Sequence, residues 1–250
     1  MTGELSLCVA PTIEPGMTVL LGMIDESGEA FLVSDGRITE EDAHGAKVIY
    51  CENAIKTLRL NHSLCVGFSG VDEEWRKALW HLCVVRDGGG VGLGTDLMAQ
   101  YEQADREWPD LSYSSVKDSL GAFLTSTKVA VGPDRSLPDI NVILCGEYSG
   151  KFKLCSFGSR DGWKPTERAA SKDTFNIAAR AFGPDATESF KKKALMRLID
   201  NTADPVCRAT ELIRDYATKF PLDVNMIITV RRSSKGFALE RLCKSGCAVA

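Results

Sequence analysis

The sequence lacks the features that would assign it to a membrane, nucleic-acid-binding or metal-binding class. No apolar segment approaches the length of a membrane-spanning helix, and residues 1–16 lack the basic start and long apolar stretch of a secretory signal. The formal net charge is −4 and no basic run is long enough to form a stripe, so neither a membrane nor a nucleic acid is expected as a partner. No Cys-x-x-Cys pair is present, and the three histidines lie at no ligand spacing to a cysteine, so no metal is expected. The glycine run over 88–94 fits neither a dinucleotide-binding nor a Walker A pattern, so no cofactor is expected either.

The nine cysteines are an odd number, and most of them lie inside apolar strand or helix patterns. Cys65, Cys83, Cys145 and Cys155 are examples. This pattern favours free core thiols in a reducing compartment and predicts a cytoplasmic protein.

What the chain does contain is an ordinary globular composition, with 44% hydrophobic and 26% charged residues. Strand patterns come first, helical patterns follow, and strands, two helices and a strand pair close the chain. This segregation favours an α+β fold. Residues 1–16, broken by Pro11, Pro15 and Gly16, are predicted to be a leader segment, and residues 17–250 a single domain without internal repeats.

Two kinds of periodicity set the expected elements. Alternating or β-rich runs flanked by turn residues predict strands over 17–24, 30–39, 56–60, 64–68, 139–145, 151–157, 175–183, 223–230 and 237–242. Apolar residues at helical spacing predict helices over 72–86, 96–107, 114–125, from 184, and over 205–219. The segment over 40–47 is predicted to be an acidic link.

Three polar side chains are expected to meet at one end of a sheet. Thr18 begins the first strand, Asp35 ends its hairpin partner, and Lys56 opens the next strand pair. Burying such groups without partners is unfavourable, so their convergence needs a reason. The two alternatives are a catalytic site and a structural ion pair between strand ends.

The motifs around these residues resemble a known family. The order of SDGRIT (34–39), AIKTLRL (54–60) and VGFSG (66–70) is similar to that in the proteasome β-type proteins. These are N-terminal-nucleophile hydrolases, and the likeness is greatest to the bacterial proteasome-like peptidase that works with an unfoldase ring. The resemblance covers most of residues 17–242. It implies a four-layer αββα sandwich, with two antiparallel sheets flanked by helices.

The same resemblance implies a threonine-type active site. In this family the hydroxyl of an N-terminal threonine attacks a peptide carbonyl, and its own α-amine accepts the proton. Carried over by motif, Thr18 is the nucleophile, Asp35 and Lys56 set the electrostatics, and Gly67 supplies the oxyanion N–H. Asp215 and Thr218 match the family's supporting acid and hydroxyl, although a solvated helix end is an equally good interpretation of both.

Two features of the sequence depart from the family pattern. Met17 precedes Thr18 where the family has glycine, and the length of the 25–29 turn leaves open whether Thr18 or Met17 occupies the nucleophile position. Only the former offers a hydroxyl. The family's Gly-Ser-Gly turn is replaced by Arg-Ala-Phe-Gly at 180–183, which removes a supporting hydroxyl.

The predicted function is therefore that of a threonine-type endopeptidase subunit. It would form rings, act on peptides or unfolded proteins with an ATP-dependent unfoldase, and require cleavage of the Met17–Thr18 bond. Lys56→Ala is expected to abolish hydrolysis and self-processing while leaving the fold largely intact. The alternatives are a non-catalytic structural or gating subunit of the same fold and an amidase acting on a small molecule.

Overall fold

Most of the chain from Val19 to Leu242 is described by a computed structural model. The residues described are 19–42, 44, 46–70, 108–132, 140–169, 176–180, 204–222 and 224–242. The helices expected over 72–86, over 96–107 and from 184 lie outside these ranges, as do Met17 and Thr18.

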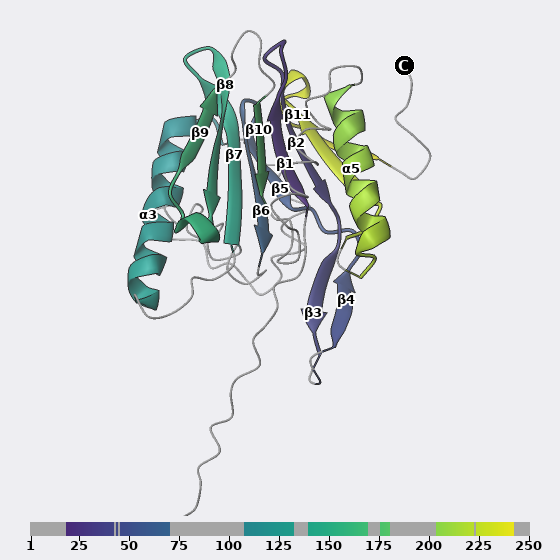
Figure 1. The fold of residues 1–250 in the computed structure, drawn as a ribbon. Coiled ribbons are helices and arrows are strands. Elements are labelled where there is room, and N and C mark those ends of the chain that lie inside the picture. Colours follow the sequence, from purple (N-terminus) through teal and green to yellow (C-terminus); the bar gives the residue numbers. More distant parts are fainter. Residues whose placement is uncertain are drawn as a thin grey trace, which may run out of the picture.

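Two five-stranded antiparallel sheets form the body of the structure (Figure 1). The first sheet has the strand order β10 (Asn176–Arg180), β1 (Leu20–Ile24), β2 (Ala30–Asp35), β11 (Ile228–Arg232) and β12 (Leu239–Leu242). The second sheet has the order β5 (Thr57–Asn61), β6 (Leu64–Gly70), β7 (Ile140–Tyr148), β8 (Lys151–Gly158) and β9 (Thr166–Ala169). The short 3₁₀ turns η1 (Ser159–Asp161) and η2 (Ser233–Lys235) follow β8 and β11.

The hairpin of β1 and β2 carries an alternating pattern that decides where its side chains point. Gly28, with φ 86°, allows the tight turn that the sequence predicted. Val19, Leu21 and Met23 pack with helix α5 (Pro205–Lys219), whereas Leu20 and Ile24 pack toward the second sheet. Successive residues of a strand face opposite sides, so the even-numbered residues of β1 lie between the sheets.

The two described helices cover the outer faces of the sheets. Helix α3 (Tyr113–Val131) begins at the N-cap Ser112 and packs against the second sheet. Helix α5 (Pro205–Lys219) begins at the N-cap Asp204, with proline in its first turn, and packs against the first sheet. The bounds predicted for α5 are confirmed, and α3 extends six residues beyond the predicted end at 125.

The described elements therefore stack in the order helix, sheet, sheet, helix (Figure 1). The expected α+β class with antiparallel sheets is confirmed. Two glycines bring the sheets close together. A Cβ at Gly22 would lie 2.7 Å from Ile143 Cγ2, and one at Gly67 would lie 2.7 Å from Leu20 Cδ1.

The region predicted as an acidic link is instead a hairpin. Strands β3 (Ile38–Glu41) and β4 (Lys47–Cys51) pair with each other and project from the body (Figure 1). Val48, Ile49 and Tyr50 on β4 are all exposed. The acidic composition of the segment favoured a link, but the two strands pair through their backbones.

The cysteines follow the predicted pattern only in part. Cys65, Cys145 and Cys155 are buried and free, as expected, and burial raises the pKa of the Cys145 thiol well above its usual range. Cys207 on α5 is disulfide-bonded, so the expectation of free thiols does not extend to every cysteine. No described helix is long and apolar enough to cross a membrane. Within the same residues, no group of histidine, cysteine and carboxylate side chains is placed to hold a metal ion.

Candidate active site

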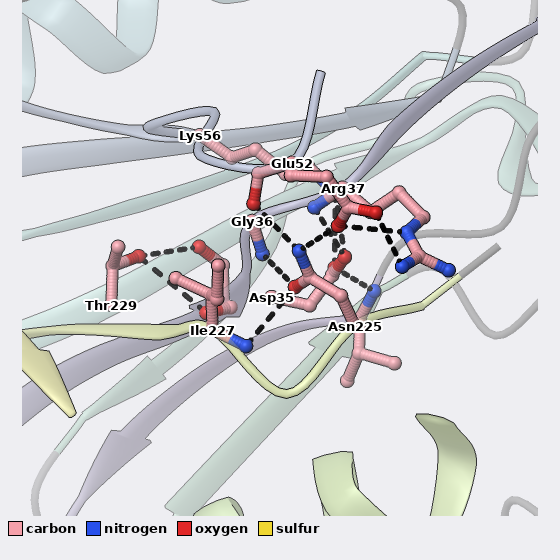
Figure 2. Close-up of polar contacts among 10 residues, drawn as sticks. Asp35, Gly36, Arg37, Glu52, Lys56, Asn225, Ile227 and Thr229 are labelled. Carbon is pink, nitrogen blue, oxygen red and sulfur yellow. Dashed lines mark hydrogen bonds and ion pairs between the residues drawn. The ribbon is translucent and has the colours of Figure 1, made fainter. Parts of the chain in front are cut away.

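A buried ion pair joins the two sheets at one end of the sandwich. Asp35 is the last residue of β2, and Lys56 immediately precedes β5 (Figure 2). The Lys56 Nζ atom lies 3.0 Å from Oδ1 and 3.1 Å from Oδ2 of Asp35. The Asp35 side chain is fully buried, and that of Lys56 is only 5% exposed. The sequence prediction that these two residues converge is confirmed by this contact.

The Asp35 carboxylate is also held by backbone N–H groups. Val19 N donates to Oδ1 at 2.9 Å, and Arg37 N donates to Oδ2 at 3.0 Å. Each carboxylate oxygen thus accepts one backbone hydrogen bond and one from the lysine, which fixes its orientation. Charge-assisted hydrogen bonds of this kind are the strong ones and are needed to keep an ion pair in a buried site.

The segment that carries Lys56 is fastened to both sheets. Lys56 O accepts a hydrogen bond from Phe68 N of β6 at 2.9 Å, and Ala54 N donates to Gly36 O at 2.8 Å. Thr57, the first residue of β5, accepts hydrogen bonds from the Arg231 side chain. The Lys56 amine is therefore presented to Asp35 from a backbone with little freedom to move.

Arg231 on β11 is a further link between the sheets, and its side chain is only 2% exposed. Its Nε donates to Thr57 Oγ1 at 2.9 Å, its Nη2 to Thr57 O at 3.1 Å, and its Nη1 to Phe237 O at 2.7 Å. Beside it, the hydroxyls of Ser34 and Thr229 are hydrogen-bonded at 2.9 Å. Polar groups between the sheets therefore have specific partners at this position.

A second network borders the pair on its solvent side (Figure 2). Arg37 makes two hydrogen bonds to the Glu52 carboxylate, at 2.7 and 3.1 Å. Asn225 accepts from Gly36 N and Ile227 N and donates to the Glu52 carbonyl and to Glu52 Oε2. Desolvation alone would raise the pKa of Glu52, but the hydrogen bonds from Arg37 and Asn225 and the Arg37 charge lower it overall. These hydrogen bonds connect the base of the β3–β4 hairpin to Asn225 in the loop before β11.

The register of β1 bears on the position of the nucleophile. Leu20 pairs with Ser34, and Asp35 N donates to Val19 O at 3.2 Å, so Val19 is the residue directly opposite Asp35. Its side chain is buried and packs with α5. Thr18 and Met17, the two residues between which the sequence could not choose, lie outside the described residues.

Gly67 lies inside β6 and not at a turn. It pairs with Thr57 on one side and Ile143 on the other, and its missing side chain makes room for Leu20. The glycine at the end of the strand is Gly70, with φ 103°. The role of Gly67 as an oxyanion donor stays a prediction from the resemblance.

Asp215 and Thr218 lie on helix α5. Both are exposed, and the Thr218 hydroxyl donates to Arg214 O of the same helix at 3.0 Å. Their role as supporting acid and hydroxyl stays a prediction from the resemblance. Of the 180–183 segment, only Arg180, at the end of β10, is described.

Asn225 is one of the residues around the site that sequence reasoning missed. It lies in a stretch predicted as strand, but β11 begins three residues later. Its Oδ1 accepts from the N–H two residues ahead, at 3.2 Å. An asparagine that interrupts a strand pattern just after a helix is a signal for this local hydrogen bond.

Comparison with known proteins identifies the fold. No protein-family model and no curated protein sequence matches the chain. Its structure is similar to the crystal structure of eukaryotic HslV from Trypanosoma brucei, with a TM-score of 0.51 and 15% sequence identity. The match covers 86% of this chain and 98% of that one. The chain thus shares the fold of that structure, and at this identity the likeness extends to the fold alone.

Proposed function

We propose that this protein is a threonine-type peptidase subunit with Thr18 as its nucleophile. The observation that carries the proposal is the buried Asp35–Lys56 pair at the start of β1, where Val19 N donates to the same carboxylate. Thr18 is covalently joined to that nitrogen. Thr18 therefore directly precedes a residue whose N–H binds the Asp35 carboxylate.

The alternation on β1 favours Thr18 over Met17. The even-numbered residues Leu20 and Ile24 face the second sheet, from which Lys56 comes, whereas the odd-numbered ones pack with α5. Continued by two residues, this pattern predicts the face of Leu20 for Thr18 and the face of Val19 for Met17. We therefore expect the hydroxyl on the side of the second sheet.

In the proposed reaction, the Thr18 oxygen attacks the carbonyl carbon of a peptide bond. The Thr18 α-amine accepts the hydroxyl proton and passes it to the leaving amine, which departs as the C–N bond breaks. Water then hydrolyses the resulting ester and regenerates the free threonine. The fixed ammonium of Lys56 stabilises negative charge that develops at this site. An α-amine exists at Thr18 only after the Met17–Thr18 bond has been cleaved.

The remaining parts of the proposal come from the family resemblance. We infer a cytoplasmic ring of identical subunits that encloses the sites and receives peptides or unfolded proteins from an ATP-dependent unfoldase. The similar fold of the trypanosome HslV supports the subunit architecture and leaves activity to be tested.

The intact mass of the purified full-length chain is the first measurement. We expect wild-type protein to lose residues 1–17 and to hydrolyse unstructured peptides. Thr18→Ala should keep the leader and lack hydrolysis. Thr127→Ala is the matched control, because the Thr127 hydroxyl donates to Phe123 O within α3. A wild-type chain that retains its leader and cleaves no peptide would refute the peptidase proposal.

A second candidate function is a non-catalytic structural or gating subunit. The observation that favours it is the Thr218 hydroxyl, which is exposed on α5 and donates to Arg214 O of its own helix. In that case the full-length mass is retained, and the purified chain assembles into oligomers that lack hydrolysis. Size-exclusion chromatography with light scattering separates this outcome from an isolated amidase.

A further inference from the structure

Arg231 on β11 is a buried arginine that the proposed reaction does not use. The residue is only 2% exposed. Its Nε and Nη2 atoms donate to the hydroxyl and the carbonyl oxygen of Thr57, at 2.9 and 3.1 Å, and its Nη1 atom donates to Phe237 O at 2.7 Å. Burial of a charged group is costly even when its N–H groups have partners, so the place of this arginine calls for an explanation.

Thr57 directly follows Lys56 and begins an edge strand of the second sheet. In the part of the chain that the structure describes, β5 pairs on one side, with β6. The backbone of an edge strand is held by fewer hydrogen bonds than that of a central strand, so its first residues are displaced more easily. Arg231 reaches this strand from the opposite sheet and fixes its first residue.

The strand that carries Arg231 also holds the strand that carries Asp35. β11 pairs with β2, and Ile228 lies opposite Asp35. Asp35 is thus fixed to β11 through the backbone ladder, whereas Lys56 is fixed to β11 through Thr57 and the guanidinium. Both members of the ion pair are therefore held in place relative to one strand.

The chemistry of arginine suits this task better than that of lysine. A planar guanidinium that donates two hydrogen bonds to one residue sets both the position and the orientation of Thr57. An ammonium on a flexible stem carries the same charge but cannot reproduce that geometry. Lys56 itself has such a stem, so the place of its amine depends on the backbone that carries it.

We propose that Arg231 is a positioning residue, which keeps the Lys56 amine against the Asp35 carboxylate by holding Thr57 to β11. Its effect on hydrolysis rests on the proposed function, but its effect on the place of the amine does not. A purely structural role predicts a different result: loss of Arg231 would lower stability and leave the amine in place in every molecule that is folded.

The place of the amine is tested by chemical modification of the folded full-length protein. Formaldehyde with a borohydride reductant methylates accessible amines, and the extent at Lys56 is followed over time by mass spectrometry of proteolytic fragments. Lys235, whose side chain is 57% exposed, serves as the internal reference. We expect Arg231→Lys to raise the rate at Lys56 by about tenfold or more, since a hydrogen bond from a charged group is lost. Arg232→Lys is the matched control, because Arg232 follows on the same strand and lies beside Glu240, with its Nε atom 3.4 Å from Oε1.

A second pair of variants tests the same contact from the side of its acceptor. Thr57→Val removes the hydroxyl that accepts from Arg231 and keeps the shape of the side chain, whereas Thr57→Ser keeps the hydroxyl. We expect a raised rate at Lys56 in the valine variant and the wild-type rate in the serine variant. Wild-type rates in both Arg231→Lys and Thr57→Val would overturn the proposal, and if Arg231→Lys does not fold, Thr57→Val decides alone. An equal rise in Asn61→Ala, whose amide donates to Trp108 O and Leu111 O, would also overturn it, because the rise would then come from lost stability.

The kinetics separate this proposal from the peptidase proposal. In an active wild type, Arg231→Lys should lower kcat for peptide hydrolysis by about tenfold with little change in KM, because the displaced ammonium no longer stabilises charge that develops in the reaction. An unchanged kcat in that variant would overturn the positioning role. A wild type that cleaves no peptide, together with the expected rise in methylation of Lys56, would overturn the peptidase proposal and support the assignment of Arg231.

Discussion

Two ion pairs lie side by side in this protein and differ in almost every physical respect. Asp35 and Lys56 connect the two sheets and are screened from water, whereas Arg37 and Glu52 join the two ends of the β3–β4 hairpin, with the Glu52 side chain 42% exposed. Each pair consists of one carboxylate and one basic side chain from residues 35–56. The two pairs therefore differ in burial and not in chemical type.

This difference in burial determines what each pair contributes to stability. A buried pair is weak support for stability, because desolvation offsets the attraction between the charges, but loss of one member leaves a buried charge uncompensated. A partly exposed pair contributes little either way. The inner pair is thus better explained by a requirement for a fixed ammonium, and the outer pair by the attachment of the β3–β4 hairpin.

The largest expected effect comes from breaking the inner pair. Lys56→Met should abolish hydrolysis and also lower the free energy of unfolding by about 3–5 kcal/mol, because Asp35 is left buried without its cation. This revises the expectation from sequence that Lys56→Ala leaves the fold largely intact. Urea denaturation measures the change, and Lys117→Met, which breaks the exposed pair with Glu167, is the control. A loss below about 1 kcal/mol would place the inner pair in the same class as surface pairs.

An intermediate effect is expected at Asn225, whose side-chain amide bonds to Gly36, next to Asp35, and to Glu52. Asn225→Ala removes the partner of two backbone N–H groups, and we expect a loss of about 2 kcal/mol. Asn61→Ala is the matched comparison. Its amide donates to Trp108 O and Leu111 O far from the ion pair. Both variants should lose similar stability, but only Asn225→Ala should slow hydrolysis. Equal rates in the two variants would show that the outer network has no influence on the site.

The smallest effect is expected at Glu52. Because its pKa is lowered on folding, the carboxylate contributes stability above its ordinary pKa of 4.5, and that stability is lost as the pH falls through the folded value. Glu52→Gln should therefore cost under about 1 kcal/mol at neutral pH and flatten the decline of stability as the pH falls below 4.5. Thermal unfolding measured across this range checks the expectation. A variant that keeps the wild-type acid profile would assign that decline to other carboxylates.

Local pattern was enough to predict much of the fold. The β1–β2 hairpin, the strands β7 and β8 and the bounds of α5 follow from alternation, glycine turns and proline in the first helical turn. The convergence of Asp35 and Lys56 also followed from the order of the strands. These features depend on residues that are close in sequence or on motifs with a fixed order.

What could not be predicted depends on contacts between distant segments. The β3–β4 hairpin was not predicted because its pairing is made by the backbone, while most of its side chains are polar or exposed. Asn225 and Arg231 acquire their roles from partners more than 170 residues earlier in the chain. No sequence window contains both ends of such a bond, and amide and guanidinium groups are common on surfaces.

The two glycines between the sheets have a consequence for how this protein tolerates change. Gly22 and Gly67 offer no chemical group, yet any side chain at either position would meet the opposite sheet at 2.7 Å. A side chain at either position would move the two sheets apart, and the Lys56 amine would no longer reach the Asp35 carboxylate. A saturation mutagenesis screen for function should therefore find these two silent positions about as intolerant as the charged residues themselves, with alanine already harmful. The distance between the two sheets at this site is therefore set by the absence of side chains at these two positions.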